Sequence, residues 1–269
     1  MENYICMTCG TQYATREEPP DQCVICEDER QYIGWNGQQW TALTDMKAAG
    51  YRNEFRELER GLIGIRTTPG FAIGQMAILA RTLGGNVLWD CVSYIDGETI
   101  TKIMELGGIQ AIAVSHPHFY SSIVEWSHAF ENAPVYIPEA DKQWVQRPDP
   151  VIRHWRDSVK LLPGVTLIQC GGHFEGSAVL HLADGANNRG VLLVGDTIAV
   201  AQDRKHVSFM WSYPNLIPLP PSAIRRIAEA VRPYAFDRIY SAWHGKVLVE
   251  DAKAAVERSA ERYIRQIQD

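Results

Sequence analysis

The sequence predicts an α/β protein in which two β-sheets pack face to face with helices outside, preceded by a small four-cysteine module. Three observations support this prediction. Short apolar runs broken by Gly and Pro begin at Leu62, and they come in two groups. Helical segments follow each group. Four of the six cysteines lie within the first 26 residues, apart from these runs.

The chain divides into three predicted parts. Residues 1–35 form a small separate module, 36–57 a connector with short helical character, and 58–269 one large domain. A chain of 269 residues is long enough for one such domain and one such module.

Apolar patterning and turn residues place the elements of the large domain. Expected strands cover 61–69, 71–82, 86–96, 109–118, 134–139, 165–173, 177–184, 190–200 and 238–245. Expected helices cover 98–108, 121–130, 140–145, 222–234 and 249–267.

Net charge, the length of apolar runs and the number of cysteines indicate which partners and which cellular compartment to expect. A net charge of -6 gives no basic footprint, so nucleic acid is not expected as a partner. No apolar run is long enough to span a bilayer, and the N-terminus lacks the pattern of a signal peptide, so we expect a cytoplasmic protein without membrane contact. In a reducing compartment, six cysteines indicate metal ligands or structural thiols rather than disulfides.

Cys6, Cys9, Cys23 and Cys26 have the spacing C-x2-C, thirteen residues, C-x2-C. Two such turns complete a tetrahedral thiolate site, and the motif resembles a zinc-ribbon or rubredoxin-like knuckle. Zinc in this site would have a structural role and stabilise the fold of the module. Iron bound by the same four thiolates would instead make the module a one-electron carrier. Zinc is favoured because no flavin or haem motif accompanies the cysteines. A module this small needs the metal to fold.

Metal-ligand residue types also end four apolar strands of the large domain. His116 and His118 follow AIAV, and their i, i+2 spacing puts both imidazoles on one side. His173 follows Gly171 and Gly172, which allow close backbone approach. Asp196 ends VLLVGD and His244 ends IYSAWH. These residues predict a catalytic-type metal site.

The order H-x-H, G-H, G-D-T and a late strand ending in His resembles the metallo-β-lactamase superfamily, over about residues 58–269. The resemblance implies an αββα sandwich with a metal site at one edge. Most members are hydrolases, and others are persulfide dioxygenases and flavodiiron proteins. His116, His118 and His173 match the histidines of the first metal. Asp196 matches the bridging aspartate, and His244 matches the last ligand of the second metal.

The chain departs from the usual H-x-H-x-D-H motif. Tyr120 stands in place of the aspartate and Ser121 in place of the last histidine. Neither is a good zinc ligand at neutral pH, since a phenol has a pKa of about 10. We therefore expect one zinc ion, with the second site weak or empty.

A zinc ion on three histidines with an open position lowers the pKa of bound water and so provides a hydroxide nucleophile. Asp196 would orient that water, act as a general base, or orient a histidine from outside the metal site. Tyr120 would either donate a hydrogen bond to an oxyanion or pack in the core. Phe209, Met210, Trp211 and Tyr213 would either form a substrate wall or belong to a core strand pair, and His206 and Lys246 are weaker candidates for polar pocket groups.

Three functions fit this site. The first is a mononuclear zinc hydrolase acting on an ester, thioester, lactone or related small acyl substrate. The second is a non-haem iron oxygenase, since a mixed histidine and carboxylate set also suits iron. The third is a non-catalytic metal-containing binding protein. The long C-terminal helix and the cysteine module both offer contact surfaces for a homo-oligomer.

Overall fold

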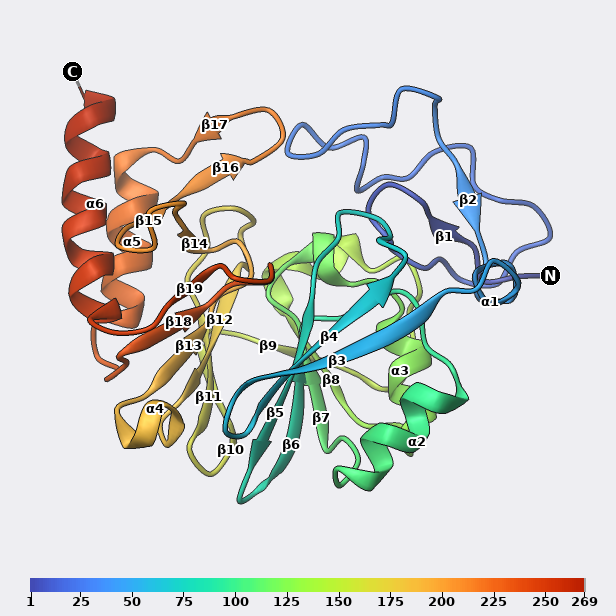
Figure 1. The fold of residues 1–269 in the computed structure, drawn as a ribbon. Helices are drawn as coiled ribbons and strands as arrows, with labels where there is room; N and C mark the ends of the chain where they lie inside the picture. The colour runs from blue at the N-terminus through green and yellow to red at the C-terminus, as the bar shows by residue number, and fades with distance from the viewer. Residues whose placement is uncertain (269) are drawn as a thin grey trace.

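Two β-sheets face each other in the computed structural model, which describes residues 1–268 (Figure 1). Helices α2 (Gly97–Glu105) and α3 (Ile123–Ala129) cover the outer face of the larger sheet. Helices α5 (Pro221–Val231) and α6 (Ala252–Gln268) cover the outer face of the smaller sheet. These four layers confirm the expected αββα sandwich.

The larger sheet has seven strands, in the spatial order β3 (Arg52–Glu59), β4 (Leu62–Thr68), β5 (Ala77–Thr82), β6 (Gly85–Trp89), β7 (Ala111–Ala113), β8 (Val135–Pro138) and β9 (Ile152–Trp155). Strands β3 to β6 are antiparallel, whereas β6 to β9 are parallel. Parallel strands bring their carboxyl ends to one edge of the sheet, which is where ligand sites form in α/β folds.

The smaller sheet has six strands, in the order β10 (Ser158–Leu162), β11 (Val165–Gln169), β12 (Ala178–Leu182), β13 (Val191–Leu193), β18 (Arg238–Tyr240) and β19 (Val247–Leu248). Only β13 and β18 are a parallel pair among these described strands. The remaining short elements are η1 (Pro117–Phe119), η2 (Glu139–Trp144), α4 (Gly185–Asn188), β14 (Ala199–Val200), β15 (Val207–Ser208), β16 (Met210–Ser212) and β17 (Ile217–Pro218).

Three apolar cores separate the four layers. Successive side chains of a strand point to opposite faces, so β6 contributes Leu88 to the core under α2 and α3, and Val87 and Trp89 to the core between the sheets. The third core lies between the smaller sheet and the helices, where Ile224 of α5 and Val256 of α6 are buried. At about 25 cal/mol per Å² of buried apolar surface, these cores supply the main driving force for folding.

The N-terminal module packs against the edge of the sandwich. Its strand β1 (Ile5–Cys6) pairs with β2 (Trp40–Thr41), and helix α1 (Leu43–Ala48) follows. Hydrogen bonds join its backbone to the large domain. For example, the Gly10 carbonyl accepts a bond from Ser93 Oγ at 2.7 Å, and the Gln12 amide donates to the Ser121 carbonyl at 3.0 Å.

Several elements differ from the sequence-based expectations. The expected connector over 36–57 contains α1, but also β2 and most of β3, an edge strand of the larger sheet. Strands β9 and β10 were not expected. The expected strand over 86–96 ends at Trp89, because Asp90 adopts a positive φ of 57° that breaks the extended chain. The domain boundaries at 35 and 57 stay a prediction.

No helix among residues 1–268 combines the length and apolar character needed to cross a membrane.

Candidate metal centre

The H-x-H loop begins where β7 ends. Asp90, at the end of the neighbouring strand β6, accepts a hydrogen bond from the Ser115 amide at 2.7 Å and so fixes the loop. The Ser115 hydroxyl in turn lies 2.9 Å from His116 Nδ1, which leaves His116 Nε2 free to face the site. His118 lies one turn further, in η1, where Pro117 begins the turn.

His173 reaches the site from the loop after β11. Gly172 has a φ of 99°, and a side chain there would meet Leu219 and Ile227, so glycine lets this loop pack against α5. The Met210 carbonyl lies 3.2 Å from His173 Nδ1. A carbonyl only accepts, so Nδ1 carries the proton and Nε2 presents its lone pair to the site.

Asp196 follows β13 of the other sheet. Gly195 has a φ of 53°, and a Cβ at this position would lie only 2.2 Å from Ser115 Oγ. Glycine therefore permits the G-D-T loop to approach the H-x-H loop. As a result, Asp196 Oδ2 lies 3.5 Å from His116 Nε2.

The three histidines and Asp196 form one group in which one ligand atom of each residue lies within 4.8 Å of the others. His118 Nδ1 and His173 Nε2 are 3.1 Å apart. Two imidazoles on one tetrahedral zinc ion would be about 3.4 Å apart, given a Zn–N distance near 2.05 Å. The arrangement is therefore close to that of ligands that share one ion.

The electrostatics of the group also fit a cation. Burial holds the pKa of His116 and His118 well below the ordinary value and lowers the pKa of His173 to about 4, so all three are neutral ligands at pH 7. Burial, with repulsion from Asp90, raises the pKa of Asp196 well above its ordinary value. His116 Nε2 and Asp196 Oδ1 are buried without a hydrogen-bond partner. A bound cation would satisfy both atoms.

His244, expected as a further ligand, lies outside this group. Its side chain is exposed and contacts Arg56 of β3. The loop after β18 carries His244 past the site, and strand pairing with β19 continues immediately afterwards at Val247. The structure does not bring His244 together with the other four expected ligands, and its ligand role stays a prediction.

Tyr120 and Ser121, which replace the usual ligands, point into the core. The Tyr120 hydroxyl donates to the Asp141 carbonyl at 3.3 Å, and its ring packs against the helices of the larger sheet. Ser121 Oγ donates to the Cys91 carbonyl at 3.1 Å and accepts from Gln75 at 3.0 Å. The packing alternative for Tyr120 therefore holds, and the oxyanion role does not.

The expected substrate wall is only partly present. Phe209 is fully buried in the core under α6, so its assignment to the wall was wrong. Tyr213 lies beside the site, with its hydroxyl donating to the Asp196 carbonyl at 3.0 Å and its ring 5.6 Å from that of His173. Trp211 is half-buried nearby. Lys246 turns back on its own loop through backbone bonds to Ser241 and Trp243, and His206 pairs with Asp203 on the surface.

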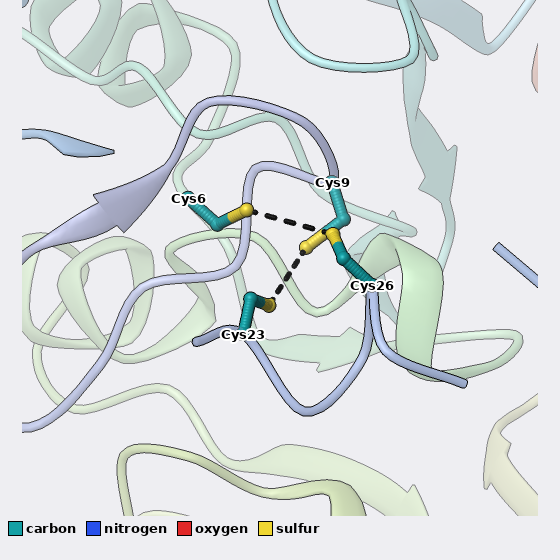
Figure 2. Close-up of side chains that lie close together, drawn as sticks. All are labelled: Cys6, Cys9, Cys23 and Cys26. Carbon is teal, nitrogen blue, oxygen red and sulfur yellow. Dashed lines mark hydrogen bonds between the residues drawn. The ribbon is translucent and has the colours of Figure 1, made fainter. Parts of the chain in front are cut away.

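The four cysteines form the second group. Their side chains point toward one another from two turns of the module (Figure 2). Cys6 and Cys26 Sγ atoms are 3.6 Å apart, as are those of Cys9 and Cys23. Two thiolates on one tetrahedral zinc ion would be about 3.8 Å apart, given a Zn–S distance near 2.3 Å. All four side chains are buried, so this cage is closed to solvent.

Residues of the cysteine module that lie over the histidine site could not be identified from the sequence. Arg30 of the cysteine module donates from Nη1 to the His173 carbonyl at 3.3 Å. Its guanidinium lies 3.9 Å from the centre of the Phe174 ring and forms an ion pair with Asp28 at 2.6 Å. No local pattern links Arg30 to a histidine 143 positions away. Asp90 did carry a signal, because it ends an apolar strand as Asp196 does.

No family model matches the sequence. The chain is 54% identical over 267 residues to the uncharacterized protein YmaE of Bacillus subtilis (strain 168), which covers 98% of this chain and 97% of that protein.

Solved structures with a similar fold are far more distant in sequence. VMB-1 is 13% identical with a TM-score of 0.59, over 80% of this chain and 98% of that one. DIM-1 metallo-beta-lactamase exposed to ceftazidime is 15% identical with a TM-score of 0.57, over 79% and 98%. A B3 metallo-beta-lactamase with an active-site glutamic acid is 13% identical with a TM-score of 0.51, over 85% and 97%. The chain thus belongs to the same family as YmaE, and it has the fold of the metallo-β-lactamase superfamily.

Proposed function

We propose that the protein is a metal-dependent hydrolase that holds one metal ion with His116, His118, His173 and Asp196. The observation that supports this most is the convergence of three neutral, buried imidazoles and one buried carboxylate on a common point. A metal bound there would supply Lewis-acid chemistry, lowering the pKa of a coordinated water and polarising a substrate carbonyl.

The protein's own groups have distinct tasks in this proposal. The Met210 carbonyl and the Ser115 hydroxyl hold the rings of His173 and His116, so that one nitrogen of each faces the centre. Asp196 has two carboxylate oxygens, so if one of them holds the metal, the other is available to accept a proton from a water. Tyr213 fixes the Asp196 backbone through its hydroxyl.

For the metal we propose zinc, because three imidazoles form a common catalytic zinc set, and zinc can expand to five ligands to take a water beside Asp196. The four-thiolate cage would hold a second, structural zinc. We propose an ester, thioester, lactone or related small acyl compound as the substrate. The enclosure of the site supports a small substrate, since none of the four ligand residues is more than 4% exposed.

The test combines metal analysis with a substrate panel. Protein purified without added metal should contain two zinc ions per chain, and His116→Ala should contain one. Esters, thioesters and lactones are then assayed with the wild type, with His116→Ala and with His154→Ala, whose histidine is exposed and remote from the group. Turnover that His116→Ala abolishes and His154→Ala retains supports the hydrolase. Metal occupancy without turnover on any member would instead favour a binding protein.

An iron oxygenase is the second candidate, because the ligand set mixes histidine with a carboxylate. The same metal analysis separates the two functions. Iron in the histidine group, with oxygen consumption that depends on His116, would replace the hydrolase proposal.

A further inference from the structure

A segment of the cysteine module covers the histidine site. This cover segment, residues 28–31, contacts the site through Arg30, whose Nη1 donates to the His173 carbonyl. The guanidinium stacks over Phe174, and that ring lies 4.9 Å from His118 and 5.2 Å from His173 between ring centres. Through the Phe174 ring, Arg30 therefore packs against the side of the site formed by His118 and His173.

The position of the cover segment depends on the cysteine cage. The amides of Cys26 and Glu27 both donate to the Cys23 carbonyl, at 2.9 and 3.0 Å, and form the turn that leads into the segment. Asp28 then accepts bonds from the Arg30 backbone amide and from its side chain. The segment begins two residues after Cys26, so a metal on Cys23 and Cys26 would anchor its start.

The other side of the cover segment is fixed by the ribbon of β16 and β17. Ser212 Oγ donates to the Arg30 carbonyl at 3.1 Å, and Asn215 donates to the carbonyls of Glu29 and Gln31 at 2.9 and 3.2 Å. In Figure 1 the tip of this ribbon lies next to the module. The same ribbon supplies the Met210 carbonyl that orients His173.

Aromatic rings give a second physical link between the two groups. Trp144 of η2 packs against the cysteine cluster, and its ring meets Phe174 edge to face at 5.5 Å. The cover segment, Trp144 and Phe174 thus form a continuous set of contacts between the cysteine group and the histidine group.

We infer that Arg30 is a positioning residue for His173, and that metal binding to the four cysteines and to the histidine group is therefore cooperative. A metal in the cage orders the cover segment, so the histidine site no longer bears that ordering cost when its own ion binds. The inference rests on metal binding by both groups but not on the reaction proposed for the histidine site.

Co²⁺ titration of the metal-free full chain, in competition with a chelator, tests the coupling. Thiolate ligands give Co²⁺ a charge-transfer absorption that imidazole and carboxylate ligands lack, so the two sites are followed separately. Arg30→Ala should weaken Co²⁺ binding at the histidine group by about tenfold, within the usual range of coupling energies. Arg30→Lys keeps the charge but loses the planar fork, and it should restore only part of the affinity. Arg16→Ala, an exposed arginine of the same module, should leave both sites unchanged.

Reciprocity supplies the decisive measurement. In the wild-type background, His118→Ala should weaken Co²⁺ binding at the cysteines by about the same factor of ten. In the Arg30→Ala background, His118→Ala should leave Co²⁺ binding at the cysteines unchanged. If His118→Ala leaves the cysteine affinity unchanged in the wild type, the sites are independent and the inference is wrong.

A variant on the opposite side of the cover segment tests the inference independently, in case Arg30→Ala misfolds. Asn215→Ala removes two bonds to the cover segment, and should lower histidine-site affinity in the same direction by a few-fold. If Asn215→Ala and Arg30→Lys both bind Co²⁺ at the histidine group as tightly as wild type does, the inference is also wrong. Turnover is not measured in any of these assays, so failure of the hydrolase proposal would be a separate result.

Discussion

The cysteine group and the histidine group are both buried sets of four candidate metal ligands, but the chain assembles them in different ways. The cysteines come from two short turns within residues 6–26. The histidine group combines loops after β7 and β11 with the loop after β13, which draws on both sheets. A small cysteine cage depends on its metal for folding. The histidine site lies at strand ends of a sandwich that is stabilised by its own apolar cores. Metal loss should therefore unfold the first region and only empty the second.

The largest effect expected from this comparison is that of Cys23→Ser. Structural zinc contributes roughly 10–16 kcal/mol of apparent folding free energy in small modules, so residues 1–41 should lose protection in hydrogen exchange while the two sheets keep theirs. Cys170→Ser, at a buried cysteine outside the cage, serves as the matched control. Equal loss of protection in the sheets would show that the regions do not differ as described.

Asp196→Asn should act on the second region without unfolding it. The amide keeps the shape of the carboxylate but is a poor ligand, so metal affinity should fall by more than about 100-fold. At pH values where Asp196 would be charged, the metal-free variant should be more stable than metal-free wild type, because burial, and then repulsion from Asp90, disfavours the charged carboxylate. Metal titration and denaturant unfolding measure the two effects, with Asp203→Asn on the surface as the control.

Asp141 lies between the two regions and should give a pH-dependent effect. It is fully buried, and burial raises the pKa of Asp141 to about 6. A raised folded-state pKa means that the folded protein binds the proton more tightly, so stability is lost as pH rises from about 4 through 6. Asp141→Asn should therefore be more stable than wild type at pH 8, by on the order of 2–3 kcal/mol, and similar to it near pH 4.

Thermal unfolding across this pH range checks the Asp141 prediction. Glu139→Gln, in the same short helix but less buried, should show no comparable pH trend. A stability difference for Asp141→Asn that is constant with pH would rule out the titration as its cause.

His244→Ala should give the smallest effect. The side chain is exposed and outside the histidine group, so metal affinity and unfolding free energy should stay within about 0.5 kcal/mol of wild type. Isothermal titration with Zn²⁺ makes the measurement. Loss of a bound ion in this variant would show that the loop after β18 supplies a ligand after all.

Sequence reasoning succeeded where chemistry follows local pattern. Paired C-x2-C turns present thiolates to one ion whatever surrounds them, and apolar strands that end in His116 or Asp196 aim those residues at a sheet edge. His244 and Phe209 have similar local patterns, but the structure places both away from the histidine group. His244 also ends an apolar strand, but loop geometry takes it away from the site. Phe209 alternates with the half-buried Ser208 and Met210 and packs under α6.

By itself, the sequence determined the four cysteines, four of the five residues expected at the histidine site, the αββα layers and the replacement of two usual ligands by Tyr120 and Ser121. Each of these depends on residue type and short spacing. Only the tertiary structure decided that the cysteine module lies over the histidine site and places Arg30 against His173. That contact joins residues 143 positions apart, and its formation depends on how whole elements pack rather than on any local preference of the chain.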